Sequence, residues 1–322
     1  MHKVYITNVI PKEAVDLLRK KGFEVSVNDS ERKLTEAELK NVFSKYEAVI
    51  SLVHDRIDER VIAAASPKLK VIANYAVGYD NIDVIFAKRR GIVVTNTPGV
   101  AGESVAEHTF LLILTLAKKL IEADRYVRSG KFSGWDPNIF LSAQIWGKTI
   151  GIVGLGKIGS YVGHIAYGGF KMKILYHDIT RSEDFEMLTE AQFVPLEKLL
   201  KEADIVTLHV PLCRETTHLI GKKELAMMKG SAILINTARG PVVDQEALID
   251  ALTKQKIAGA GLDVYDDEHH IPHELRVLGN TVLTPHIASA TFETRSAMAR
   301  LTAQNVIDVF SGREPAGLVK VS

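Results

Sequence analysis

The chain has 322 residues, of which 46% are apolar and 25% are charged, and its formal net charge at pH 7 is +1. This length exceeds that of one ordinary hydrophobic core and predicts two domains. A nearly neutral chain without a run of Lys or Arg has no field to attract nucleic acid or an acidic membrane, so a small neutral or anionic ligand is expected. The only cysteine, Cys213, excludes an intramolecular disulfide.

No segment is expected to enter a membrane. The longest apolar run, Thr109 to Ala117, is far shorter than the roughly 20 residues that span a bilayer. The N-terminus, MHKVYITNVI, lacks the basic and then apolar pattern of a signal peptide. We therefore expect a cytoplasmic protein.

The first part of the chain alternates short β-branched runs with amphipathic segments. The runs VYIT, FEVSV, AVISLV, KVIANYAVG and IVVTN are interspersed with PKEAVDLLRKKG, TEAELKNVFSKY and DERVIAAA. This alternation is typical of an α/β fold. A long amphipathic helix is expected from about Glu103 to Ser129, followed by SGWDPNIFLSAQIWG, an aromatic and apolar loop without helical or strand periodicity.

A buried strand that runs into a glycine-rich turn and a helix is expected at residues 148 to 163, KTIGIVGLGKIGSYVG. The pattern Gly154-x-Gly156-x-x-Gly159 in this context is a dinucleotide-binding fingerprint. Gly154 allows the tight turn, Gly156 lets backbone approach a pyrophosphate, and Gly159 lets the helix pack closely on the strand. The N-terminus of the helix would hold the phosphates.

Asp178 ends the next expected strand, KILYHD, where a carboxylate can accept hydrogen bonds from an adenosine ribose. The same carboxylate would repel a 2′-phosphate, which favours NAD over NADP. NADP stays an alternative because of Arg181, whose guanidinium could pair with a 2′-phosphate. The alternative is that Arg181 is a solvated loop residue.

A second alternating series follows and completes a nucleotide-binding domain. Its strands DIVTLHVPL, AILINTARG, IAGAGLDVYD and TVLTPH bring Arg239, Asp263 with Glu268, and His286 to their carboxyl ends, where ligands bind in open α/β sheets. After a break at Pro285, TFETRSAMARLTAQNVIDVFSG has helical spacing and could return to the first domain.

These residue types suit hydride transfer to a ketone that carries a carboxylate. A histidine can give the carbonyl oxygen its proton, and a neighbouring carboxylate would favour the charged ring and fix its tautomer. A guanidinium can bind a carboxylate by a two-bond fork and polarise the adjacent carbonyl. Taken singly, Arg239 could be an ion-pair partner, Glu268 an exposed acid and His286 a turn histidine.

The chain resembles the D-isomer-specific 2-hydroxyacid dehydrogenases over nearly its whole length. The similar segments are NYAVGYDNID, NTPGVAGESVAEH, GKTIGIVGLGKIG, LHVPL, LINTARGPVVDQEAL, GLDVYDDE and LTPHIASAT. The resemblance implies two doubly wound parallel-sheet domains. A flavodoxin-like substrate domain, 1–99 and 287–322, would contain an inserted Rossmann NAD-binding domain, 100–286, with the active site in the cleft between them. It also implies a homodimer, with contacts through the long helix and the loop around Trp135 to Trp146.

The resemblance assigns roles to individual residues. Arg239 would bind the substrate, Glu268 would pair with the histidine, and His286 would donate the proton. The substrate carboxylate would also meet backbone N–H groups at Val77 and Gly78. The implied cofactor contacts, besides the fingerprint glycines and Asp178, are Lys157 and Ile158 at the pyrophosphate, Val210, Pro211 and Thr216 near the adenine, and Thr237, Ala238 and Asp263 near the nicotinamide.

The sequence departs from the family after Glu268 and again after His286. His269 stands where proline is common, and Ala288 stands where glycine is frequent. With His270 and His273, His269 forms a cluster that invites a metal-site interpretation. Its spacing matches no standard zinc pattern and it supplies no thiolate, so no metal is expected and a polar surface loop is preferred.

The segments YAVGYDNID and GWDPNIFL look most like the glyoxylate and hydroxypyruvate reductase branch. We expect an NAD-dependent reductase of a small 2-oxo acid, glyoxylate or hydroxypyruvate, which oxidises D-2-hydroxy acids in reverse. One alternative is a short-form D-3-phosphoglycerate dehydrogenase, against which no further basic cluster is seen near Val77. The other is an NAD-sensing binding protein of the same fold, which would be expected to carry long flexible extensions.

Overall fold

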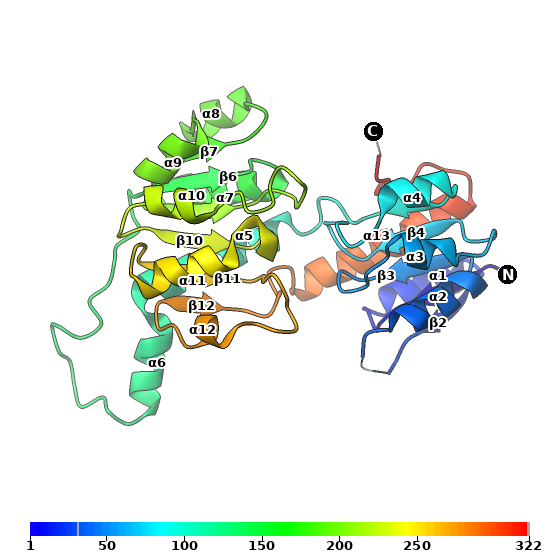
Figure 1. Ribbon diagram of the computed structural model, residues 1–322, viewed down its shortest axis with the longest axis horizontal. Helices are drawn as coiled ribbons and strands as arrows, with labels where there is room; N and C mark the ends of the chain where they lie inside the picture. Colours follow the sequence, from blue (N-terminus) through cyan, green and yellow to red (C-terminus); the bar gives the residue numbers. More distant parts are fainter. Residues whose placement is uncertain (31, 321–322) are drawn as a thin grey trace. The chain divides into compact units, whose positions relative to one another are not determined.

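The structure, a computed structural model, describes residues 1–30 and 32–320. It contains two compact units, each built on its own parallel sheet (Figure 1). Unit 1 comprises Met1–Ala101 and Ala290–Ser322, and unit 2 comprises Gly102–Ser289. The predicted α/β class with two doubly wound parallel sheets is confirmed. No helix within 1–30 and 32–320 is both long and apolar enough to cross a membrane.

Unit 1 has a five-stranded sheet in the order β2-β1-β3-β4-β5, which is the flavodoxin-like order. Its central strands are apolar on both faces because helices cover both faces. Val49 and Ile72 pack with Phe43 on one side, while their neighbours in the strands pack toward the C-terminal helix on the other. The strands are β1 Lys3–Ile6, β2 Glu24–Val27, β3 Ala48–Ser51, β4 Val71–Asn74 and β5 Val93–Thr95; the helices are α1 Glu13–Lys20, α2 Glu36–Lys45, α3 Glu59–Ala63, α4 Val84–Arg89 and α13 Phe292–Phe310.

The last helix of the chain, α13, belongs to unit 1. It packs along α1 and against β4, and its buried side chains Met298, Ala299 and Ala303 join the core that Ile6 and Ile50 form. Residues from both ends of the chain therefore build one core, and unit 2 is inserted between them.

Unit 2 has a seven-stranded parallel sheet in the order β12-β11-β10-β9-β6-β7-β8. Counted from β6, this is the order of a dinucleotide-binding sheet with one added strand, and the order reverses between β6 and β9. Helices α5 and α7 cover one face, and α9, α10 and α11 cover the other. The strands are β6 Thr149–Val153, β7 Lys173–His177, β8 Gln192–Phe193, β9 Ile205–Leu208, β10 Ile233–Asn236, β11 Gly259–Leu262 and β12 Thr281–Leu283; the helices are α5 Gly102–Lys118, α6 Leu120–Arg128, α7 Lys157–Phe170, α8 Glu183–Thr189, α9 Leu196–Glu202, α10 Lys222–Met227, η1 Gly240–Val242, α11 Gln245–Thr253 and α12 His273–Arg276.

The single long helix expected from Glu103 to Ser129 is wrong in one respect, because the structure has two helices there. Lys119 separates α5 from α6 and adopts a left-handed conformation, with φ +52°. The physical reason is burial. The side chains of α5 are buried against the sheet as far as Ala117, whereas α6 has no buried residue. In Figure 1, α6 and the loop after it extend away from the seven-stranded sheet.

Candidate active site

The glycine-rich turn lies between β6 and α7. Gly154 has φ +93°, and a Cβ there would lie 2.8 Å from the carbonyl carbon of His209, so the backbones of two loops meet at this point. A Cβ on Gly159 would overlap the carbonyl oxygen of Gly154. A Cβ on Gly156 would meet nothing within 4 Å. The turn is thus closed toward the protein and open at Gly156, where a pyrophosphate could approach the helix N-terminus, and the residues present fit a dinucleotide.

The neighbouring loops complete this end of the sheet. His209 and Val210 follow β9, and Gly154 follows β6, so these loops flank the position where the strand order reverses and where open α/β sheets bind ligands. Burial lowers the pKa of His209 to about 3, so its ring is uncharged at neutral pH. The loop after β9 is closed on itself by Thr216, whose hydroxyl donates a 2.6 Å hydrogen bond to the carbonyl oxygen of Pro211.

Asp178 lies at the end of β7, next to the glycine-rich turn. Its Oδ2 accepts a 2.6 Å hydrogen bond from the N–H of Leu155, and its Oδ1 accepts one of 3.1 Å from the N–H of Thr180. Arg181 instead forms an ion pair with Glu186, in which its Nε and Nη2 make three hydrogen bonds of 2.7 to 3.2 Å. Hydrogen bonds from Arg181 and then from the Tyr176 hydroxyl lower the pKa of Glu186 to about 2.

Arg239 lies in the turn after β10, which the buried Asn236 organises. The Nδ2 of Asn236 donates to the carbonyl oxygen of Arg239 at 2.8 Å, and its Oδ1 accepts from the N–H of Ala238 at 3.0 Å. Gly240 follows, where a Cβ would overlap the backbone of Tyr265. The turn therefore packs against the segment after β11, and Arg239 is half-buried at the carboxyl edge of the sheet.

His286 and Glu268 lie side by side, although 18 positions separate them in the sequence. Nδ1 of His286 is 2.7 Å from Oε1 of Glu268. Because an ionised carboxylate only accepts hydrogen bonds, Nδ1 carries the proton of this bond, and Nε2 is the nitrogen that can exchange a proton with a ligand. The side chains are 28% and 39% exposed, so a ligand can reach the pair.

Asp263, expected near the nicotinamide, has a carboxylate that is wholly buried beneath the His286 segment. Its Oδ2 accepts from the N–H of Ala288 at 2.8 Å, and its Oδ1 accepts from the N–H of Ile287 at 2.9 Å and from the Thr284 hydroxyl at 2.7 Å. Burial raises the pKa of this carboxyl, but the hydrogen bonds from His108, Thr284 and the backbone outweigh burial and lower it. Asp263 is therefore an ionised anchor for the chain on both sides of His286.

Val77 and Gly78 lie in unit 1, in the loop after β4. Their carbonyl oxygens are held by the side chains of Asn96 at 2.7 Å and Asn74 at 2.9 Å. No hydrogen bond to either N–H is found among residues 1–30 and 32–320. Both N–H groups are thus available to an acceptor such as a carboxylate.

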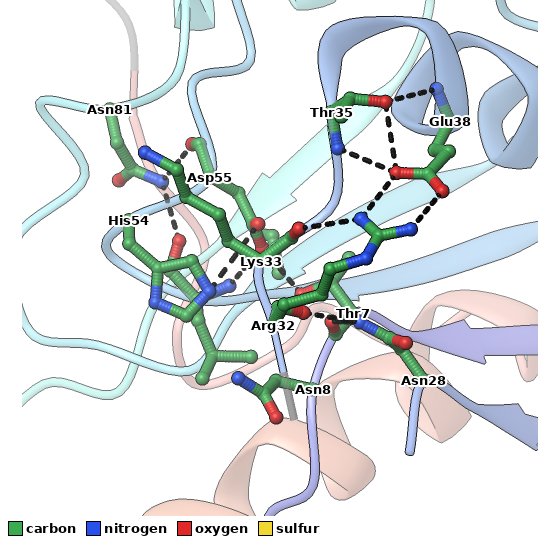
Figure 2. A network of polar contacts seen from close by, with 12 residues as sticks. Thr7, Asn8, Asn28, Arg32, Lys33, Thr35, Glu38, His54, Asp55 and Asn81 are labelled. Atoms are coloured by element: carbon green, nitrogen blue, oxygen red, sulfur yellow. Dashed lines mark hydrogen bonds and ion pairs between the residues drawn. The ribbon is translucent and has the colours of Figure 1, made fainter. Parts of the chain in front are cut away.

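A polar network joins this loop to two others, and Figure 2 shows three of its members, Thr7, Asp55 and Asn81. Asn74 donates to Asn81 at 3.0 Å, and Asn81 donates to the carbonyl oxygens of Leu52 and Asp55, each at 3.0 Å. The carboxylate of Asp55 accepts from the hydroxyl of Thr7, so the loops after β1 and β3 are joined where the strand order of unit 1 reverses. Two of these asparagines lie in the segment NYAVGYDNID, but no local sequence pattern marks them as part of a network.

The histidine cluster after Glu268 shows no ligand geometry. Residues 1–30 and 32–320 contain no group of three or more His, Cys, Asp or Glu that could hold a metal ion. His269 and His270 are exposed, and their N–H groups donate to the side chain and the backbone of Asp267.

Comparison with known proteins identifies the family. Residues 110–288 match the model of the D-isomer specific 2-hydroxyacid dehydrogenase, NAD binding domain. A glyoxylate reductase of Thermococcus gammatolerans is 48% identical over 321 residues, which cover 98% of this chain and 95% of the relative. The chain belongs to the D-isomer-specific 2-hydroxyacid dehydrogenase family. It is an NAD(P)-dependent oxidoreductase that acts on the CH–OH group of 2-hydroxy acids, and unit 2 carries the cofactor-binding domain.

Two solved structures are similar over almost the whole chain. The NADPH-dependent glyoxylate/hydroxypyruvate reductase of Sinorhizobium meliloti, in complex with NADP and malonate, has a TM-score of 0.88 and 31% identity, covering 99% of this chain and 96% of that one. The D-lactate dehydrogenase of Aquifex aeolicus, complexed with NAD and lactic acid, has a TM-score of 0.83 and 33% identity, covering 96% of each chain. Similar structures thus bind either dinucleotide.

Changing Gly156 to Ala tests whether the open side of the turn receives the pyrophosphate. Gly156 has φ −71° and free space at its Cβ, so the variant should fold normally. A methyl group there would obstruct the phosphates, and the Kd for NADH should rise by at least about tenfold, equivalent to about 1.4 kcal/mol. Gly168→Ala, within the helix α7 that Gly156 precedes and also with free space at its Cβ, is the matched control and should bind NADH as the wild type does. Equal NADH affinity in both variants would place the pyrophosphate elsewhere.

Proposed function

We propose that this protein reduces glyoxylate, or the related hydroxypyruvate, to the corresponding 2-hydroxy acid with NADH. The observation that carries the proposal is the His286–Glu268 pair, which leaves Nε2 of an accessible histidine able to donate a proton. The substrate class is supported by relatives named glyoxylate reductase, which are 46% to 48% identical over 98% of the chain.

The proposed mechanism assigns one task to each group. Arg239 binds the substrate carboxylate and polarises the adjacent carbonyl. For the N–H groups of Val77 and Gly78, in unit 1, the family resemblance implies a carboxylate as the acceptor. The bound dinucleotide supplies the hydride that reaches the carbonyl carbon. As the C=O bond becomes C–O–H, His286 gives the Nε2 proton to the oxygen, and Glu268 stabilises the charged ring before the transfer. In the reverse direction, neutral His286 takes the proton from the hydroxyl.

The cofactor contacts are likewise proposed from the geometry of unit 2 and the family resemblance. The pyrophosphate would lie over the turn and the first residues of α7, the adenosine between Asp178 and the loop after β9, and the nicotinamide near the turn after β10 and Asp263. The residues in this proposal are Gly154, Gly156, Lys157, Ile158, Gly159, Asp178, Val210, Pro211, Thr216, Thr237, Ala238 and Asp263.

Steady-state kinetics with a panel of 2-oxo acids tests the function. Glyoxylate, hydroxypyruvate, pyruvate and 3-phosphohydroxypyruvate would each be assayed with NADH and with NADPH. We expect the highest kcat/KM with glyoxylate or hydroxypyruvate. A preference for the phosphorylated substrate would instead favour a D-3-phosphoglycerate dehydrogenase. Tight NADH binding without turnover of any 2-oxo acid would favour an NAD-sensing binding protein.

We propose NAD as the preferred dinucleotide because of how the end of β7 is arranged. The carboxylate of Asp178 lies where the adenosine ribose is expected and would repel a 2′-phosphate. Arg181, the cation that could offset this repulsion, is bound to Glu186 by three hydrogen bonds and would have to leave that partner. The relative of Sinorhizobium meliloti is NADPH-dependent, so the fold itself does not determine this choice.

Two substitutions should shift the cofactor preference by separate routes. Asp178→Ala removes the repulsion together with the ribose contact, so kcat/KM should fall with NADH and rise with NADPH. Glu186→Gln keeps an acceptor for the Tyr176 hydroxyl but removes the charge that holds Arg181, so kcat/KM should rise with NADPH alone. The measurement is the ratio of kcat/KM for the two cofactors. A wild-type enzyme that already prefers NADPH would contradict the assignment of Asp178.

Two substitutions test the proton donor and its partner. His286→Ala removes the donor and should slow reduction about 10²- to 10⁴-fold while NADH still binds. Glu268→Gln keeps the shape of the side chain but removes the ionised acceptor of the hydrogen bond from Nδ1 of His286, so kcat should fall while the Kd for NADH stays unchanged. A Glu268→Gln enzyme with wild-type kcat would make Glu268 a bystander.

We also propose that the protein is a homodimer. Large apolar side chains are exposed along α6 and the following loop, including Val127 at 56%, Trp135 at 85% and Leu141 at 66%. Exposed apolar surface on this scale is typical of a protein–protein interface.

We further propose a cytoplasmic location. It is supported by the single cysteine, Cys213, which is exposed and free and would suit a reducing compartment.

A further inference from the structure

Two adjacent polar residues of α5 contact the two loops that carry the proposed catalytic side chains. Nε2 of His108 is 3.0 Å from Oγ1 of Thr284, in the segment before His286. Oγ1 of Thr109 is 3.2 Å from Oγ1 of Thr237, in the turn before Arg239. Successive residues of a helix project about 100° apart, so one turn of α5 can reach both loops. The mechanism proposed above uses neither helix residue.

The hydrogen bonds at His108 have a defined direction. The hydroxyl of Thr284 donates to Oδ1 of Asp263 at 2.7 Å, so its oxygen can accept the hydrogen bond from Nε2–H of His108. The same ring nitrogen lies 3.4 Å from Oδ1 of Asp263. His108 is therefore the outermost donor of a chain that leads to a buried carboxylate, and it is itself only 8% exposed.

The carboxylate of Asp263 in turn fixes the backbone around His286. It binds the N–H groups of Ile287 and Ala288, while the carbonyl oxygen of Asp263 accepts from the N–H of His286 at 2.9 Å. His286 has φ +54°, a left-handed conformation that is unfavourable for a residue with a side chain and needs such support. Loss of one donor to a buried carboxylate would weaken this support, because the remaining groups would have to rearrange.

We propose that His108 is a positioning residue for the reduction: through Thr284 and Asp263 it holds the backbone of His286 in the conformation that aims Nε2 at the substrate. The inference rests on the proposed role of His286. A displaced proton donor still allows substrate and cofactor to bind, so the loss should fall on kcat rather than on KM. Misplacement of a catalytic group by about 1 Å can cost about 10²-fold in rate.

The test compares His108→Ala, His108→Gln and Thr284→Val in the full-length protein, with glyoxylate and NADH. His108→Ala should lower kcat about 10- to 100-fold, with KM for glyoxylate and Kd for NADH within about threefold of the wild type. His108→Gln should recover most of kcat, because its amide nitrogen can replace Nε2–H as donor to Thr284. Thr284→Val keeps the shape but removes the linking hydroxyl, and should lower kcat as His108→Ala does. Thr115→Val, a buried polar position of the same helix, should leave kcat unchanged.

A double-mutant cycle with His286→Ala separates positioning from general destabilisation. If His108 acts through His286, His108→Ala should lower the rate of the His286→Ala enzyme by less than about twofold. An equal fold-loss in both backgrounds would overturn the inference, as would wild-type kcat in His108→Ala. If His108→Ala does not fold, His108→Gln and Thr284→Val decide, and wild-type kcat in Thr284→Val would overturn it. The His286→Ala single variant tests the proposed function separately: normal activity in that variant would refute His286 as the proton donor.

Discussion

The arrangement of polar groups at the carboxyl end of the seven-stranded sheet depends on the carboxylate of Asp263. This carboxylate is completely buried and remains ionised because a hydroxyl, two backbone N–H groups and a histidine surround it. These donors come from α5 and from the segment after β12, while Asp263 itself follows β11. A buried charge without its partners would cost several kcal/mol, so the three segments must come together as one arrangement. The accessible pair of His286 and Glu268 is built on this support.

The order of the strands explains why ligand-binding groups gather where they do. Both sheets are parallel and doubly wound, and in each the order reverses once, between β6 and β9 in unit 2 and between β1 and β3 in unit 1. Adjacent loops diverge at such points and expose backbone at the carboxyl ends of the strands. In unit 2 the glycine-rich turn and the loop after β9 flank this position. In unit 1 the contact between Thr7 and Asp55 joins the two loops, and the network extends to the loop of Val77 and Gly78.

Much of this arrangement could be predicted from local patterns. The β-branched runs gave the α/β class, and the strand–glycine–helix context gave the dinucleotide turn. Arg239 and His286 were singled out because each follows an apolar run, and parallel strands bring such residues to one edge. The break at Lys119 could not be predicted because the apolar pattern continues past it. The contacts of His108 and Asn74 could not be predicted because they depend on tertiary packing: His108 and Thr284 are 176 positions apart, and no local periodicity encodes such a pair.

The most direct test of the central claim is a crystal structure with NADH and oxamate, an unreactive isostere of a 2-oxo acid. The account expects the oxamate carboxylate within hydrogen-bond distance of Arg239. The amide oxygen that stands in for the reacting carbonyl should lie within hydrogen-bond distance of Nε2 of His286, with Nδ1 still bound to Glu268. A complex in which that oxygen contacts another donor, with His286 turned away from the ligand, would contradict the account.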